Sequence, residues 1–169
     1  MEEVIPYEQI EGRIYLIRGK KVMFDCDLAR LYGVETKVLN QAVKRNIERF
    51  PDDFMFILSE VEAKNLRSQF VTSSLENYGG VRYLPTAFTE QGVAMLSGVL
   101  KSPRAIAVNI QIFRTFTKLR EMIQENDYLR RKLEVLEKDY DEKFAIVFDA
   151  IRRLLNTEDE PISEIGFKN

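Results

Sequence analysis

From Arg104 to Glu160 the chain contains no proline and no glycine. These residues most often end or kink a helix, so their absence over this length predicts one very long helix. Ser102-Pro103 stands directly before the stretch and is a typical helix start, because proline is favoured at the first helical position. The chain has 169 residues, so we expect one domain followed by a helical extension at 104–158 and a flexible tail at 159–169.

Apolar residues in the extension recur in alternating steps of three and four, and this spacing holds for about three heptads. The pattern is typical of a coiled coil. Asn126 occupies a core position, where a single buried asparagine favours a parallel pair in register. We therefore expect a homodimer; the alternative is an amphipathic helix that folds back on its own domain. The predicted dimerisation residues are Leu119, Met122, Asn126, Leu129, Leu133, Leu136 and Tyr140.

The composition excludes several kinds of chemistry. The chain has no histidine and one cysteine. Without histidine there is no Ser-His-Asp or Cys-His catalytic site and no histidine-ligated metal, and one cysteine builds neither an internal disulfide nor a zinc site. We expect no enzyme activity, no metal and no cofactor. The cysteine count, the acidic first residues and the lack of a long apolar run predict a cytoplasmic protein that does not enter the membrane.

The charge is unevenly distributed along the chain. The formal net charge of −2 argues by itself against a nucleic-acid partner. However, residues 1–12 form a segment with four acidic and no basic side chains, and residues 13–120 carry 17 Lys and Arg against 10 Asp and Glu. Residues 121–169 carry 8 against 13. A basic body with acidic ends points towards nucleic acid, while an unevenly charged solvated surface is the alternative.

The body, residues 13–103, alternates between short strand and helix patterns and predicts an α+β fold. Two β-branched and aromatic runs around Gly19 are typical of a hairpin. Asp25 is expected to cap a helix, and Ser59 with Glu62 forms a capping box. The expected strands are 14–17, 22–24, a buried one at 54–58 and 81–84; the expected helices are 25–32, 35–49, 60–68 and 89–100, with a loop or wing inside 70–83.

Residues 25–46 have the pattern of a helix-turn-helix. A short helix ends at Gly33, and in the second helix Leu39, Val43 and Ile47 face inward while the outer face is polar and basic. Such a second helix lies in the DNA major groove, where amides pair with adenine and Lys or Arg reads guanine or holds phosphates. A solvated basic helix face is the alternative. The predicted DNA-binding residues are Thr36, Lys37, Asn40, Gln41, Lys44, Arg45, Asn46 and Arg49.

Several sequence blocks match a known family in their expected order. They are Phe24 to Val34, Leu39 to Asn46, Arg49 to Phe56 and Arg82 to Leu96. Together they resemble the KilA-N-type DNA-binding domains of phages and bacteria, in particular the subgroup called the open-reading-frame-six N-terminal domain. The resemblance covers about Ile14 to Leu100. It implies a small α+β DNA-binding domain in a prophage-type regulator and provides no set of base-reading residues.

The expected function is therefore regulation by binding double-stranded DNA as a homodimer. Arg67 and Arg82, on either side of the predicted wing, are expected to touch the DNA backbone. Cys26 is expected to be a partly buried structural thiol. The alternative function is an antirepressor-like protein that acts on a repressor through the coiled coil, with weak or no DNA binding.

Overall fold

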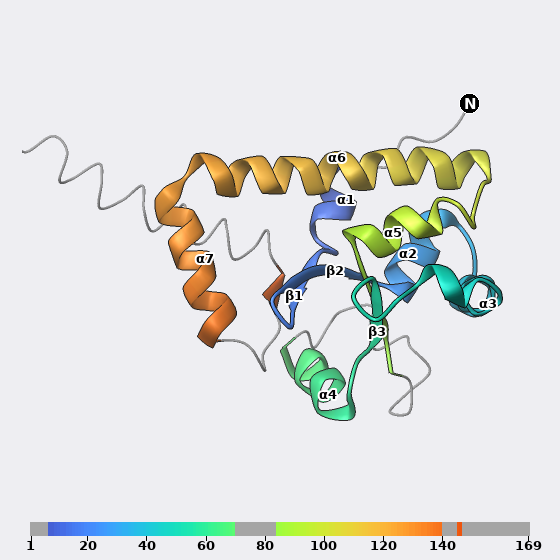
Figure 1. The fold of residues 1–169 in the computed structure, drawn as a ribbon, viewed down its shortest axis with the longest axis horizontal. Helices are drawn as coiled ribbons and strands as arrows, with labels where there is room; N and C mark the ends of the chain where they lie inside the picture. The colour runs from blue at the N-terminus through green and yellow to red at the C-terminus, as the bar shows by residue number, and fades with distance from the viewer. Residues whose placement is uncertain (1–6, 70–83, 140–144, 147–169) are drawn as a thin grey trace, which may run out of the picture.

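The computed structural model describes residues 7–69, 84–139 and 145–146 (Figure 1). An antiparallel sheet of five strands, in the order β3-β4-β2-β1-β5, forms its centre. The strands are β1 (Tyr15–Ile17), β2 (Lys20–Phe24), β3 (Met55–Ile57), β4 (Thr86–Thr89) and β5 (Ala145–Ile146). The helices are α1 (Tyr7–Glu11), α2 (Asp25–Tyr32), α3 (Thr36–Arg45), the 3-10 helix η1 (Ile47–Arg49), α4 (Glu60–Gln69), α5 (Glu90–Leu96), α6 (Pro103–Glu125) and α7 (Asp127–Asp139). The predicted α+β class is confirmed.

Helices cover both faces of the sheet. On one face Met23 and Phe88 pack in a core with α2, α5 and α6. On the other face Val22 and Ala87 pack with Leu66 of α4. Neighbouring residues of one strand belong to different cores because successive side chains of a strand point to opposite faces. Both sides of the sheet are therefore apolar, and β1 and β2 appear in the sequence as short continuous apolar runs.

The hairpin between β1 and β2 is confirmed, and its turn is tied to α4. Arg18 and Gly19 both have positive φ, 53° and 72°, as a two-residue type I′ turn requires. The Arg18 guanidinium donates two hydrogen bonds to the Glu62 carboxylate, at 2.8 and 2.7 Å, and lies 4.4 Å from the ring centroid of Phe56. The turn and the first turn of α4 are thereby held together.

The predicted capping box at the start of α4 is also confirmed. The backbone N–H of Glu62 donates to Ser59 Oγ at 3.1 Å, and the backbone N–H of Ser59 donates to the Glu62 carboxylate at 2.8 Å. The hydrogen bonds from Arg18 hold the pKa of Glu62 below its usual range, and the bond from Ser59 acts in the same direction.

We expect Glu62→Gln to lower the free energy of unfolding at pH 7 by about 1 kcal/mol or less, because the pair with Arg18 is solvent-exposed. Glutamine preserves the capping box, so the variant isolates the charge. The pKa of Glu62 is lower in the folded state than in the unfolded state. Its charge therefore stabilises the fold at pH values above the unfolded-state pKa, and this contribution is lost as the pH falls through the folded-state pKa. Urea unfolding between pH 7 and pH 3 should therefore show that the free energy of unfolding decreases less for the variant than for the wild type as the pH falls. Glu60→Gln, an exposed change in the same helical turn, is the control; an equal effect from both variants would refute the assignment.

Three local predictions in the body are wrong in detail. Helix α2 has Phe24 as its N-cap, and Asp25 is its first helical residue. Helix α3 ends at Arg45 and η1 follows, which leaves Ile47 exposed instead of facing inward. Strand β3 lies at the sheet edge and leaves Ile57 58% exposed, so it is not a buried strand. The strand expected at 81–84 lies largely outside the described residues, and the described strand nearby is β4 at 86–89.

Helix α6 belongs to the domain core. Its start is as predicted, with Ser102 as the N-cap and proline in the first turn. One face of α6 is fully buried against the sheet side of the domain, and α1 adds Ile10 to the same core. The predicted domain boundaries at residues 12 and 103 remain predictions, and in the structure α1 and α6 pack in the same core as the body between them. The buried apolar residues of α6 are Ala105, Val108, Ile112, Phe116 and Leu119.

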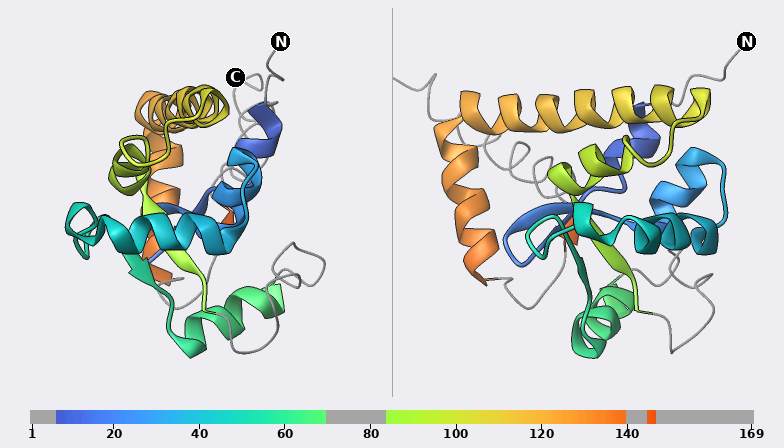
Figure 2. Two further views of the ribbon diagram at one scale, coloured as in Figure 1. Left: turned by 90° about the vertical axis from the view of Figure 1, so that its right-hand side faces the viewer. Right: turned by 45° about the vertical axis from the view of Figure 1, so that its right-hand side comes forward.

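The prediction of one helix over 104–158 is wrong at Asn126. This residue leaves the helical conformation, with φ −128° and ψ 102°. Its Oδ1 accepts a hydrogen bond from the backbone N–H of Leu129 at 2.8 Å, which makes it the N-cap of α7. Helix α7 turns away from the axis of α6 (Figures 1 and 2). Further on, Ala145 and Ile146 pair with β1 as a strand.

The predicted dimer seam is used within the chain itself. Leu119 and Leu129 are 0% and 1% exposed and lie in the domain core, with Met122 packed against that core. Their burial fits the alternative to a coiled-coil dimer, in which the amphipathic helix folds back on its own domain. Among residues 7–69 and 84–139, no helix combines the length and apolar character needed to span a bilayer. Of the remaining seam residues, the side chains of Leu133 and Leu136 and all of Tyr140 lie outside the described residues.

Candidate nucleic-acid interface

The corner between α2 and α3 has the geometry that the sequence predicts. Gly33 adopts φ 74° and ψ 28°, a left-handed conformation that favours glycine. The backbone N–H of Val34 donates to the Ala29 carbonyl at 2.9 Å, which completes a Schellman cap. Arg104 Nε donates to the Leu31 carbonyl at 2.9 Å. The corner is therefore fixed by its own backbone and by the start of α6.

Helix α3 presents most of its surface to solvent. Only Leu39 and Val43 are buried, and the helix contains three basic and no acidic residues. Viewed from the side in Figure 2 (left), α3 runs across the face turned towards the reader. Its exposed polar and basic side chains, which we call the α3 outer surface, are Lys37, Gln41, Lys44 and Arg45. The structure thus brings together four of the predicted DNA-binding residues.

Asn40 has a different role from the one predicted. Its Nδ2 donates to Asp25 Oδ2 at 2.9 Å, and Asp25 is completely buried. The other carboxylate oxygen of Asp25 accepts from the backbone N–H of Cys26 at 2.9 Å. A buried carboxylate is costly without such hydrogen bonds. Asn40 therefore fixes the rotation of α3 on α2, and this contact turns the opposite side of α3 outward.

The remaining predicted residues lie around the α3 outer surface. Asn46 Nδ2 donates to the Ala42 carbonyl at 2.8 Å and so caps the end of α3. Thr36 is half-buried at its start. Arg49 is exposed on η1, and its guanidinium lies against Gly98, where an added Cβ would be 2.7 Å from Nη1. Of these three, Arg49 alone presents an exposed charged group beside α3.

One exposed residue beside the α3 outer surface is absent from the predicted DNA-binding residues. Val38 is 45% exposed and neighbours Lys37 on the open side of α3. Its exposure could be predicted from the sequence, because helical spacing places Val38 outside the buried face that Leu39 and Val43 define. The predicted wing remains a prediction, since the side chain of Arg67 and all of Arg82 lie outside the described residues.

The single cysteine lies at the start of α2 and packs against the second core, which includes Val22 and Leu66. Cys26 is partly buried, as expected. Burial raises the pKa of its thiol far above the usual range, and the neighbouring carboxylates of Asp27 and Asp25 raise it further. The thiol is therefore protonated at neutral pH and is a poor nucleophile.

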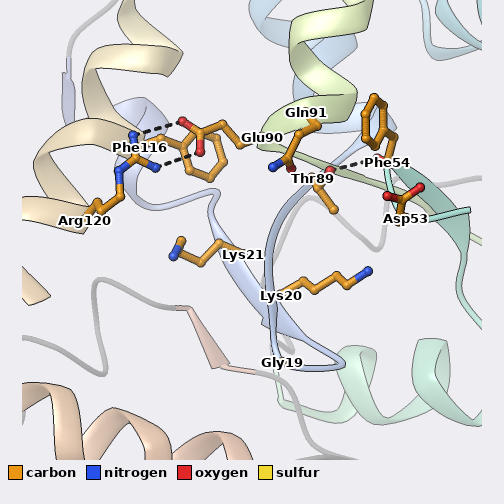
Figure 3. A pocket seen from close by; sticks show the side chains of 10 residues that line it. All are labelled: Gly19, Lys20, Lys21, Asp53, Phe54, Thr89, Glu90, Gln91, Phe116 and Arg120. Carbon is orange, nitrogen blue, oxygen red and sulfur yellow. Dashed lines mark hydrogen bonds and ion pairs between the residues drawn. The ribbon is translucent and has the colours of Figure 1, made fainter. Parts of the chain in front are cut away.

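A polar cavity of about 450 Å³ lies away from α3, between the β1–β2 turn and α6 (Figure 3). Arg120 donates to the Glu90 carboxylate at 2.8 and 3.4 Å, and the Phe54 carbonyl accepts from Thr89 Oγ1 at 3.1 Å. Of the two acidic residues that line the cavity, Glu90 is thus paired with an arginine. The cavity is lined by Gly19, Lys20, Lys21, Asp53, Phe54, Thr89, Glu90, Gln91, Phe116 and Arg120.

Comparison with known proteins gives a match over the α2–α3 corner and strands β1 to β4. The family model of the ORF6N domain matches residues 12–99. The matched range includes the hairpin, the α2–α3 corner, the α3 outer surface and α5. No curated protein and no solved structure matches the chain. The match spans more than half of the 169 residues, and the chain therefore belongs to the ORF6N domain family.

Proposed function

We propose that this protein binds double-stranded DNA through the α3 outer surface and acts as a phage-type transcriptional regulator. The observation that carries the proposal is the exposure of α3. A helix held by only two buried residues, beyond a tight glycine corner, leaves three basic side chains and an amide free to enter a groove. The KilA-N-type DNA-binding resemblance of the same blocks supports this assignment.

The proposed mechanism is equilibrium binding. Lys44 and Arg45, at the end of α3, contact phosphates and supply affinity that does not depend on sequence. Gln41, at the centre of the exposed side, pairs with an adenine edge in the major groove. Val38 contacts a thymine methyl group, the one apolar feature of that groove. The basic excess of residues 13–120 draws the domain towards the duplex.

The antirepressor-like alternative needs an accessible surface for a repressor. The surface that the sequence suggested for it was the coiled-coil seam. Leu119 and Leu129 of that seam are buried in the chain's own core, so the specific observation that favoured this alternative is lost. DNA binding is therefore the function that the geometry supports best.

The test is fluorescence anisotropy of the full chain with a labelled random-sequence duplex. At ~50 mM salt we expect binding with a dissociation constant at or below ~10⁻⁵ M, and weaker binding as salt rises. Selection of bound sequences from the same pool then measures base preference. If up to ~100 µM protein leaves the anisotropy unchanged at this salt, the proposal fails and a protein partner becomes the better hypothesis.

A further inference from the structure

Helix α6 carries a stripe of mainly apolar side chains beside its buried face, and of these Phe113 also packs against the edge of the domain core. Ile106 and Ile110 are 52% and 47% exposed, Phe113 is half-buried and Thr117 is exposed. Steps of four, three and four place these side chains on one face of the helix. In Figure 1, α6 runs along the top of the molecule with the sheet beneath it. A shallow, open groove of about 660 Å³ lies along the second half of the stripe and is lined by Ile110, Phe113, Arg114, Thr117, Lys118 and Glu121.

The stripe is symmetric about its own midpoint. A second α6 can lie antiparallel to the first, with a two-fold axis between the levels of residues 111 and 112. Ile110 then comes opposite the partner's Phe113. In the same register Ile106 comes opposite the partner's Thr117. Each member of the stripe thus meets another member, which is the self-complementarity that a two-fold interface requires.

The charges at the two ends of α6 support the same partner. The helix begins beside Lys101 and Arg104 and ends with Glu121 and Glu125. This order is unfavourable for the helix's own dipole, whose positive end is the N-terminus. Within one chain Lys101 and Glu121 are ~30 Å apart, at 1.5 Å per residue. An antiparallel copy brings Glu121 to the partner's helix start, beside its lysine and its positive dipole end.

We propose that two copies of this chain form a dimer by packing the outer faces of their α6 helices antiparallel. The apolar stripes supply the contact and the charged ends set the direction. This interface lies on a different face of α6 from Leu119, so it is compatible with the buried core of each copy. It replaces the parallel coiled coil expected from the heptads, and it is independent of the proposed DNA binding.

Sedimentation equilibrium of the full chain between ~1 and ~200 µM, a concentration range that covers the dissociation constants of weak protein interfaces, tests the interface. We expect the wild type to dimerise and the Ile110→Glu, Phe113→Glu double variant to sediment as a monomer, with a dissociation constant raised at least 100-fold. The matched control is Val61→Glu, Val135→Glu. It adds the same charge at side chains that are 67% and 53% exposed on α4 and α7, and it should dimerise like the wild type. A monomeric wild type, or a dimeric stripe variant, overturns the proposal.

A charge exchange tests the antiparallel direction without changing the apolar stripe. Lys101→Glu should raise the dimer dissociation constant about three- to tenfold, since each copy contributes one exposed ion pair. Adding Glu121→Lys should restore most of the lost affinity, because the two reversed charges attract across the interface while the partner's helix dipole opposes the new lysine. Failure of the second change to restore dimerisation rules out this register. Circular dichroism of every variant establishes that the helices are retained.

Discussion

The Lys44→Ala, Arg45→Ala variant is expected to bind duplex DNA roughly 10- to 100-fold more weakly than the wild type at ~0.1 M salt. Each lost phosphate contact removes about 0.9 from the slope of log K against log salt concentration, so the slope should fall by roughly 1.8. Both side chains are exposed on α3, so the loss of stability should be small. Anisotropy titrations between ~50 and ~300 mM salt measure the affinity and the slope together.

The matched control is Arg131→Ala, Lys132→Ala. These residues are also an adjacent and exposed basic pair on a helix, but they lie on α7, at the other end of the molecule from α3 (Figure 1). The control removes the same charge, so it corrects for the general attraction of the basic body. Equal slopes for the two double variants would mean that the α3 outer surface holds no phosphates.

Gly92→Ala is expected to lower the free energy of unfolding by about 3 kcal/mol. A Cβ added at Gly92 would lie 2.2 Å from the Phe54 carbonyl oxygen and 3.3 Å from Phe88 Cβ. The neighbour is backbone in a fixed position, since the same carbonyl accepts hydrogen bonds from Thr89 N and Oγ1 at 3.0 and 3.1 Å. Alanine is intrinsically better in a helix by about 1 kcal/mol, and this gain does not offset the clash.

Gly98→Ala provides the contrast for this prediction. There the added Cβ would lie 2.7 Å from Arg49 Nη1, the end of a flexible and exposed side chain that can move aside. Urea unfolding of both variants, with the full chain, should therefore show a large loss for Gly92→Ala and a change below ~1 kcal/mol for Gly98→Ala. If Gly92→Ala unfolded at the same urea concentration as the wild type, the close approach of α5 and the Phe54 backbone would be contradicted.

The local features were predictable from the sequence because their causes are local. Gly19 and Gly33 sit where the backbone needs a positive φ, and both mark the turn or corner that the structure contains. The capping box joins Ser59 and Glu62, which are only three residues apart, so the sequence alone was enough to predict it. The α3 outer surface followed from the spacing of Leu39 and Val43, because the side opposite a buried stripe must face solvent.

The failures arise where the partner of a residue is distant in the chain. The apolar spacing around Leu119 and Leu129 shows which face of a helix is buried, but an identical spacing serves a second chain or the same domain. Asn126 is ambiguous for a similar reason, since asparagine suits both a coiled-coil core position and an N-cap. The helical wheel places Asn40 beside the polar side of α3 and so predicts a DNA contact, because the wheel does not show its partner Asp25, fifteen residues away.

The most direct test of DNA binding by α3 is site-specific photocrosslinking. A photoreactive amino acid replaces Gln41, at the centre of the α3 outer surface, or Val135 on α7 as the control, in the full chain. Under irradiation with a labelled duplex, position 41 should form a covalent adduct that unlabelled duplex competes away, and position 135 should form none. Binding of the duplex without an adduct at position 41, or with equal adducts at both positions, would contradict the proposal that this helix enters the groove.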